Sequence, residues 1–365
     1  MSVFVAIRQR VADRRLLSRE TLLGDNALLA YLALVSLVAH LLVAGNYGYF
    51  RDELYYMADG RHLAVGYVDQ PALIGWLAAL VHVTLGDSLV AIHIIPAVAG
   101  ACLVFVTGLI ARELGGGRVA QPLAALGTLT TIVFMATASI FSMDILDALW
   151  WALGAYVVVR LIQRDQPRLW LIFGLIAGVG LLTKLTMLFF GFGLVVALLI
   201  TRRSEFRSRW IWLGGAIAFA FLLPYLIWNA ANGFPTVDFW RHYGGLSGGG
   251  PIGFLGNQFL AMNPLTLPLS LGGLYFYFRT PAGKPYRVLG LTYVVLYVLL
   301  TLINAKSYFL APAYSMLYAG GAVAVERAAW VARRAWVKPA YVVALALSGL
   351  FLAPLAMPLL PPAAY

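Results

Sequence analysis

Long apolar runs recur along almost the whole chain, and they constrain its fold more than any other feature. Most of them approach the ~20 residues that a helix needs to cross the hydrocarbon core of a bilayer. Because 62% of the residues are hydrophobic and only 11% are charged, the composition lies outside the range of soluble globular proteins. We therefore expect an all-α polytopic membrane protein, with apolar runs at about 27–44, 88–110, 121–141, 145–162, 169–182, 185–201, 210–229, 262–278, 288–303, 307–325 and 339–357.

The distribution of basic residues predicts the topology. If the short apolar stretch 71–86 does not cross the membrane, most of the 26 lysines and arginines fall in loops on one side. That side is then cytoplasmic, because short cytoplasmic loops are rich in Lys and Arg. We expect about eleven transmembrane helices, with 71–86 lying along the outer interface. The outer side, or an outer helix end, receives Asp52, Glu53, Asp59, Asp69, Asp87, Asp144 and Asp238.

The same charge pattern predicts the domain organisation. Residues 1–26 form a basic cytoplasmic tail, and residues 27–365 form a single membrane domain with a polar loop at 45–87 and no C-terminal soluble domain. The net charge of +11 lies in short clusters between apolar runs, as topology signals do. We therefore expect membrane lipids, and no nucleic acid, among the partners.

The polar loop 45–87 carries the densest chemistry. Ionisable groups gathered at a membrane face indicate function by default. The adjacent carboxylates of Asp52 and Glu53 suit a general base or a metal site; they are alternatively a solvated pair with Arg51 as partner. Asp69, which stands before Gln70 and Pro71, is either a ligand or a helix cap.

Further acids lie at the outer end of the run 145–162. Asp144 either caps a helix or contributes to a site. Asp147 falls one turn deeper, where an unpaired charge is costly, so we expect it to have a partner.

The remaining polar groups stand at other outer helix ends. Lys184 and Lys306, the latter followed by Tyr308, either grip a phosphate or snorkel to the interface. In the outer loop 230–262, His242 and its aromatic neighbours suit sugar, phosphate or metal binding, or an interfacial aromatic belt. All these groups collect on one face, which favours function because unrelated structural charges need not do so.

Several of these stretches resemble a known family. Arg51–Tyr56, Gly60–Ala64 and Gly66–Pro71 resemble the first outer loop of bacterial GT-C glycosyltransferases. The nearest group is the protein O-mannosyltransferase-like family 39, which is related to lipid A aminoarabinose transferase. The similarity runs from about residue 46 to 327 and includes Ala111–Gly117, Ser142–Asp144, Thr183–Lys184 and Lys306–Pro312.

The resemblance implies a GT-C-like bundle with interfacial helices in its first outer loop. It implies inverting transfer of a sugar from a polyprenyl-phosphate donor to a lipid, glycan or protein acceptor. The expected place is the non-cytoplasmic face of the bacterial inner membrane, with the N-terminus in the cytoplasm.

The resemblance also implies roles for individual residues. Asp52 corresponds to the catalytic base, and we assign Glu53 and Asp144 to the same catalytic site. Some relatives bind a divalent metal ion through residues that correspond to Asp69 and, loosely, to His242. The predicted contacts of the donor phosphate are Arg61, Lys184, Lys306 and Tyr308.

Two departures from the family pattern concern substrate binding. Gln70 stands where many relatives carry His or Lys, and this sequence ends at Tyr365, where many relatives continue into an extracytoplasmic domain. Two other functions therefore stay open, namely a transporter or lipid flippase and an inactive partner subunit. Transporters usually place charges near the midplane on broken helices in repeats, whereas these charges lie at one face and we find no internal repeat.

Overall fold

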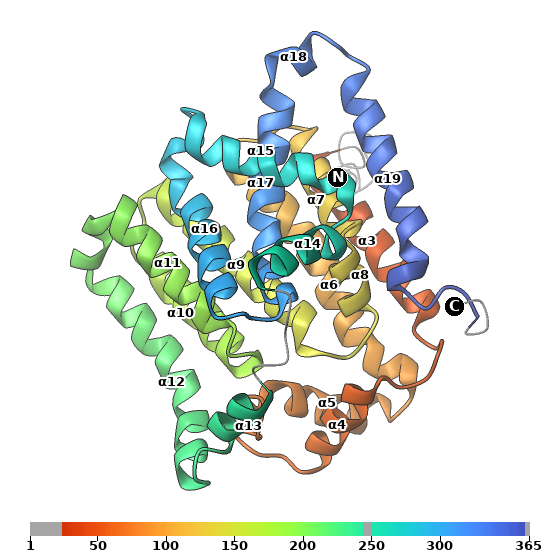
Figure 1. The fold of residues 1–365 in the computed structure, drawn as a ribbon, viewed down its shortest axis with the longest axis vertical. Helices are drawn as coiled ribbons and strands as arrows, with labels where there is room; N and C mark the ends of the chain where they lie inside the picture. Colours follow the sequence, from red (N-terminus) through yellow and green to blue (C-terminus); the bar gives the residue numbers. More distant parts are fainter. Residues whose placement is uncertain (1–23, 244–249, 362–365) are drawn as a thin grey trace, which may run out of the picture.

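Nearly every element of the structure is a helix (Figure 1). The computed structural model describes residues 24–243 and 250–361, so most of the predicted basic tail 1–26 lies outside the described residues. Seven helical segments in the described part are long and apolar enough to span a membrane, which confirms the predicted all-α polytopic class. They contain α3 (Asp25–Val43), α6 (Leu89–Glu113), α9 (Met143–Arg164), α12 (Arg209–Ala231), α16 (Arg287–Leu302), α17 (Tyr314–Arg327) and α19 (Val337–Ala356).

Two further apolar segments are broken helices. α7 (Ala120–Leu129) and α8 (Ile132–Ala138) meet at 64°, and the chain from α14 (Gly250–Ala261) to α15 (Leu267–Arg279) bends by 97°. Both breaks meet the buried hydroxyl of Tyr318, which lies 3.0 Å from Thr131 Oγ1 and 3.1 Å from Thr266 Oγ1. Irregular backbone at membrane depth has to be satisfied within the protein, and these hydroxyl contacts join the two breaks in its interior.

The predicted number of about eleven transmembrane helices is larger than the structure supports. Counting each broken pair as one span gives up to nine in the described residues. The difference comes from α10 (Leu169–Thr183) and α11 (Met187–Thr201), which have 15 residues each. At about 1.5 Å per residue each is roughly 22 Å long, which is shorter than a hydrocarbon core of about 30 Å.

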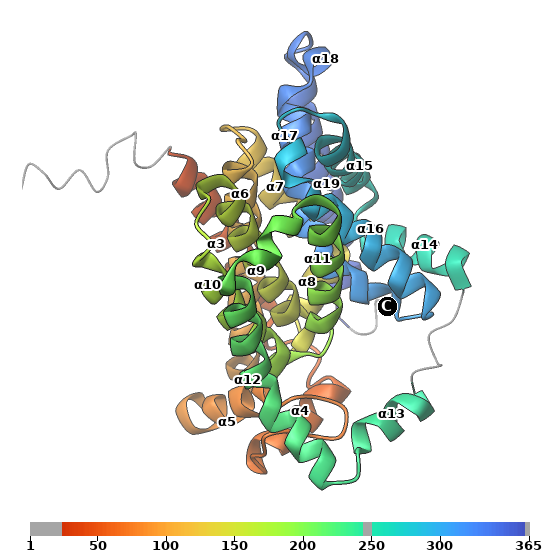
Figure 2. The same cartoon turned by 90° about the vertical axis from the view of Figure 1, so that its left-hand side faces the viewer.

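The first outer loop forms two helices at one end of the bundle. α4 (Arg51–Arg61) and α5 (Leu73–Leu85) lie at the lower end in Figure 1, and Figure 2 shows α5 crossing the direction of the long helices. α5 has only 13 residues, which agrees with the prediction that 71–86 does not span the membrane. The two helices pack closely, since a Cβ at Gly60 would lie 2.8 Å from the backbone nitrogen of Ala79.

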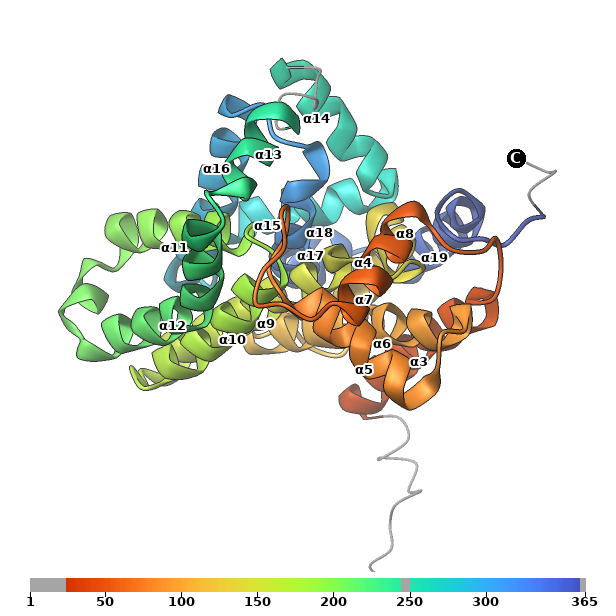
Figure 3. The same cartoon turned by 90° about the horizontal axis from the view of Figure 1, so that it is seen from below.

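The lower end also receives the C-terminal part of α12 and α13 (Pro235–Tyr243), as Figure 3 shows from below. Here the loop after α4 packs on α12, because a Cβ at Gly66 would lie 2.5 Å from the ring of Tyr225. The opposite end carries α18 (Ala329–Ala332). The short helices that remain are η1 (Arg203–Arg207), η3 (Pro264–Thr266), η4 (Lys284–Tyr286) and η5 (Ser307–Ala313).

Glycines let neighbouring helices approach closely. A Cβ at Gly214 of α12 would lie 2.2 Å from the carbonyl oxygen of Trp170 in α10, and one at Gly321 of α17 would lie 1.8 Å from that of Leu269 in α15. Small residues at crossings are typical of membrane bundles, where packing replaces the hydrophobic drive between helices. These crossings position the helix ends that carry the polar groups described next.

Candidate active site at the outer end of the bundle

The two adjacent acids at the start of α4 have different environments. The side chain of Asp52 is 40% exposed and pairs with Arg51, whose Nε lies 2.8 Å from Asp52 Oδ1. Arg51 is 85% exposed, and such surface pairs contribute little, so Asp52 is open to other partners. This environment is compatible with Asp52 as a general base. It is equally compatible with the alternative, in which Asp52 is a solvated acid paired with Arg51.

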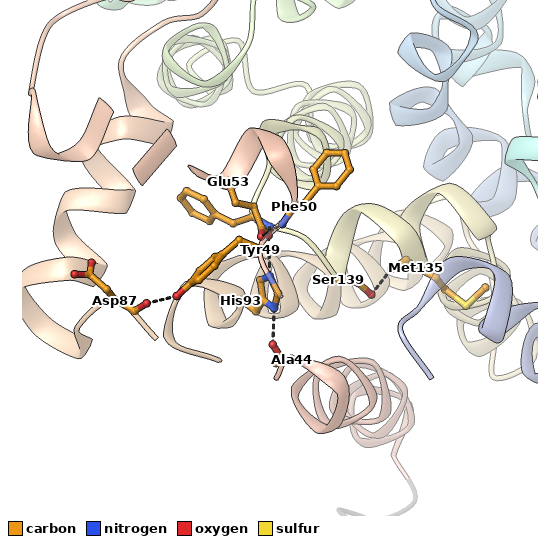
Figure 4. Close-up of polar contacts among 9 residues, drawn as sticks. Ala44, Tyr49, Phe50, Glu53, Asp87, His93, Met135 and Ser139 are labelled. Carbon is orange, nitrogen blue, oxygen red and sulfur yellow. Dashed lines mark hydrogen bonds and ion pairs between the residues drawn. The ribbon is translucent and has the colours of Figure 1, made fainter. Parts of the chain in front are cut away.

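Glu53, by contrast, is fully buried. Its Oε2 accepts a hydrogen bond from Phe50 N (2.8 Å), and its Oε1 accepts one from Phe141 N (2.6 Å) and lies 2.7 Å from His93 Nε2. Figure 4 shows this carboxylate directed toward His93 in the interior. Neighbouring residues on a helix point about 100° apart, so one acid of the pair faces outward and the other inward. Glu53 therefore does not fit a catalytic role in direct contact with substrate.

Tyr56, one turn after Asp52, lies among three acids. Its ring is 6% exposed and packs edge-on against Phe141 at 6.2 Å. Burial raises the pKa of Tyr56, and the carboxylates of Asp144, Asp52 and Asp69 raise it further. Charges from two parts of the outer loop and from α9 thus converge on one side chain. The sequence contains no spacing signal for this convergence.

Asp69 is a hydrogen-bond acceptor within the loop and not a helix cap. Its Oδ1 accepts a hydrogen bond from the Tyr55 hydroxyl at 2.7 Å, while α5 begins after Ala72 with no side-chain cap. Beside it, the buried Gln70 donates to Asp59 Oδ2 at 2.7 Å. Gln70 therefore orders the loop, at the position where many relatives carry a cation.

At the N-terminus of α9, Asp144 is not the capping residue. Ser142 is the capping residue, since its hydroxyl oxygen accepts the backbone N–H of Asp144 at 3.3 Å. The carboxylate of Asp144 is instead ion-paired with Lys184 Nζ. That ammonium also lies 5.1 Å from the ring centroid of Tyr308 and 4.7 Å from that of Phe309, distances typical of cation–π contacts.

Asp147 is buried, and its Oδ2 accepts a hydrogen bond from the Thr186 hydroxyl at 2.6 Å. Its Oδ1 has no hydrogen-bond partner within the described residues, so the expected pairing of this acid is only partly met. With Asp144, Lys184 and Tyr308 it lines a small pocket of about 10 Å³. The sequence places these residues on three separate helix ends, and the structure brings them together.

A second, open pocket of about 230 Å³ adjoins the first at Tyr308. Lys306 lines this pocket together with Phe254, Asn257, Asn304, Ala305 and Ser307. Tyr308 thus lines a pocket with Lys184 and a second pocket with Lys306. Asp52 is within electrostatic range of the same tyrosine.

Arg61 is not part of this cluster in the structure. Its Nη2 lies 3.2 Å from Asp87 Oδ2, and His82 Nδ1 lies 2.7 Å from the other oxygen of that carboxylate. The hydrogen bond from His82, with the charges of His82 and Arg61, lowers the pKa of Asp87. The predicted phosphate contact of Arg61 would require it to leave this pairing.

The predicted metal pair Asp69 and His242 does not form a complete ligand set. His242 lies on α13, exposed, with its Nδ1 2.7 Å from the carbonyl oxygen of Asp238 on the same helix. Within residues 24–243 and 250–361, no group of three His, Cys, Asp or Glu side chains is arranged to hold a metal ion. We therefore assign no step to a metal.

Comparison with known proteins supports the family resemblance. Residues 69–228 match the family described as dolichyl-phosphate-mannose-protein mannosyltransferase. The lipid A galacturonosyltransferase RgtD of Rhizobium johnstonii is 27% identical over 191 residues, which are 52% of this chain and 40% of that protein.

Solved structures share the fold. ArnT from Cupriavidus metallidurans, bound to undecaprenyl phosphate, superposes with a TM-score of 0.69 at 20% identity, covering 90% of this chain and 64% of ArnT. The oligosaccharyltransferase of Archaeoglobus fulgidus gives a TM-score of 0.57 at 13% identity, covering 89% and 55%. The chain thus spans less than two thirds of the length of each relative. The predicted GT-C resemblance is confirmed.

Proposed function

We propose that this chain, whose residues 69–228 match the family described as dolichyl-phosphate-mannose-protein mannosyltransferase, is a membrane glycosyltransferase that uses a polyprenyl-phosphate sugar. The observation that carries the proposal is the ion pair between Asp144 and Lys184, whose ammonium lies 5.1 Å from the ring centroid of Tyr308. We assign Asp52 as the base and Lys184 as the phosphate-binding cation of one site. The undecaprenyl phosphate on ArnT and the lipid A in the name of RgtD support a polyprenyl donor and a lipid or glycan acceptor.

The proposed reaction is a single displacement with inversion. Asp52 removes the proton of an acceptor hydroxyl, whose oxygen attacks the anomeric carbon as the bond to the phosphate oxygen breaks. The polyprenyl phosphate leaves with the bonding electrons, and Lys184, Lys306 and the Tyr308 hydroxyl stabilise its charge. In the structure Asp144 holds Lys184, so donor binding would exchange one anion beside Lys184 for another.

The transporter alternative has one structural feature to test, the two broken helices. Their breaks are joined by hydroxyl groups of Thr131, Tyr318 and Thr266, whereas the charged cluster lies at the helix ends. Substrate pathways of transporters usually place charges at the breaks themselves. The arrangement therefore favours an enzyme.

The test is sugar transfer by the purified protein in lipid, with labelled polyprenyl-phosphate sugars and lipid A or membrane glycans as acceptors. We expect Asp52→Asn to lower turnover at least about 100-fold, the usual effect of losing a general base. Asp238→Asn, which removes an exposed outer acid of α13, should leave turnover within about twofold and serves as the matched control.

Full transfer by Asp52→Asn would refute the assigned base. Movement of lipid or solute without a covalent product would favour the transporter. An additional arm with a chelator tests the Asp69 and His242 prediction, because metal-dependent transfer would be lost and then restored by a divalent cation.

A further inference from the structure

The buried Glu53 and His93 form a contact that the proposed reaction does not use directly. His93 lies on α6, 4% exposed, and its Nε2 is 2.7 Å from Glu53 Oε1. Its other ring nitrogen, Nδ1, is 2.7 Å from the carbonyl oxygen of Ala44. Figure 4 shows the imidazole between Glu53 and Ala44.

The protons of this contact follow from the partners. A carbonyl oxygen only accepts, so His93 Nδ1 carries a proton and donates to Ala44. The second nitrogen faces a carboxylate oxygen at hydrogen-bond distance, which requires another proton between Nε2 and Oε1. The pair is therefore an imidazolium with a carboxylate, or an imidazole with a carboxylic acid, and in both cases it shares one buried proton. A buried pair of this kind is stable when all of its hydrogen-bonding groups have partners. The Glu53 carboxylate also accepts hydrogen bonds from the backbone N–H groups of Phe50 and Phe141.

The segments joined by this pair are distant in the sequence. Ala44 follows the end of α3, Glu53 stands next to Asp52, and Phe141 comes just before Ser142, the cap of α9 that carries Asp144. The edge-on contact between the rings of Tyr56 and Phe141 joins the same two segments, α4 and the residues just before α9. The buried carboxylate of Glu53 thus connects α4, which carries Asp52, to the N-terminus of α9, which carries Asp144.

We propose that Glu53 and His93 are positioning residues that lock the first outer loop to the N-terminus of α9 and so set the place of Asp52 relative to Asp144. The inference rests on the proposed role of Asp52 for its effect on turnover. The attachment of the first outer loop to the N-terminus of α9 does not depend on that role. Misplacing a catalytic group by about 1 Å can cost about 100-fold in rate, so a loosened lock should act on kcat.

The chain offers a matched control in His40. This histidine of α3 is also 4% exposed, and its ring nitrogens contact the carbonyl oxygens of Ser36 (2.7 Å) and Met135 (3.2 Å). Both partners are backbone carbonyl groups, and they belong to α3 and α8 rather than to the first outer loop. His40→Gln therefore imposes a similar loss of buried backbone contacts at another place.

The test compares Glu53→Gln, His93→Gln, their double variant and His40→Gln. We expect the first two to lower kcat about 100-fold with a donor KM changed less than about threefold, and the double variant to be no worse than either. His40→Gln should keep kcat within about twofold. Wild-type kcat in a folded Glu53→Gln protein, or an equal loss in His40→Gln, would overturn the proposal.

A second readout needs no substrate. Amide hydrogen exchange across residues 49–62 should become at least about tenfold faster in Glu53→Gln and His93→Gln, and stay unchanged in His40→Gln. Equal exchange in His93→Gln and His40→Gln would refute the lock whatever the activity. If the wild type transfers no sugar while the exchange difference appears, the proposed function fails and the lock stands.

Discussion

At the scale of single residues, the outer loop separates charges that stand close together in the sequence. Asp52 is half-exposed while Glu53 is buried, and Asp59, near the end of α4, is 7% exposed. Burial raises the pKa of Asp59 to about 6, although the hydrogen bond from Gln70 lowers it. Desolvation is the larger of these two effects, so the buried loop disfavours the charged form of Asp59.

This environment predicts how loop stability depends on pH. An acid whose pKa is raised in the folded state costs stability when it ionises, so the cost appears as the pH rises from about 4 through 6. Asp59→Asn should therefore raise the melting temperature in detergent at pH 7 and have no such effect near pH 4. Thermal unfolding at both pH values checks this, with Asp238→Asn as control. A melting temperature lowered equally at both values would contradict it.

At the scale of elements, glycine crossings set the separation of the helices. A Cβ at Gly214 of α12 would meet the backbone of Trp170 in α10, whereas a Cβ at Gly215, the next residue, would enter open space within the described structure. The two glycines are thus a natural comparison within one helix. The α10–α12 contact matters because α10 ends at Lys184.

We expect Gly214→Ala to destabilise the protein by about 1–3 kcal/mol, because the added methyl would lie 2.2 Å from Trp170 O. Gly215→Ala should be neutral or slightly stabilising, since alanine is the better helix former. Melting temperatures of the two variants in the same detergent measure the difference. Equal shifts would show that the crossing has room for a side chain.

At the scale of the whole molecule, the polar groups of the candidate site lie at one end of the bundle. At the other end, hydrogen bonds connect the end of α17 to the loop between α6 and α7. At that other end, Glu326 of α17 accepts the backbone N–H groups of Gly117 (2.6 Å) and Val119 (2.9 Å). Arg327 donates to the carbonyl oxygen of Gly115. The loop between α6 and α7 is thus bound to the end of α17, at the opposite end of the bundle from α4 and α5 (Figure 1).

The predicted orientation places the α4–α5 end outside the cell membrane. In a protein whose single cysteine, Cys102, is replaced by alanine, we expect Leu63→Cys to react with an impermeant maleimide in intact spheroplasts. Ser204→Cys, exposed on η1, should react only after permeabilisation. The opposite labelling pattern would reverse the topology and place the proposed site in the cytoplasm.

The sequence by itself determined the membrane class, the polar first loop and the clustering of acids at one end, because hydrophobicity and charge act locally along the chain. It also identified Asp52, Asp144, Lys184 and Tyr308, and the structure brings the last three into contact. Which members of this set act in catalysis stays a prediction.

Only the tertiary structure decided the rest. It buried Glu53 against His93, made Ser142 the cap of α9, and left α10 and α11 too short to count as full spans. The burial of Glu53 depends on contacts between residues 40 and 88 positions apart, at Glu53–His93 and Glu53–Phe141. Spacing along one helix cannot predict such contacts, because the packing of whole helices, and not the local pattern, selects which side of each helix meets which neighbour.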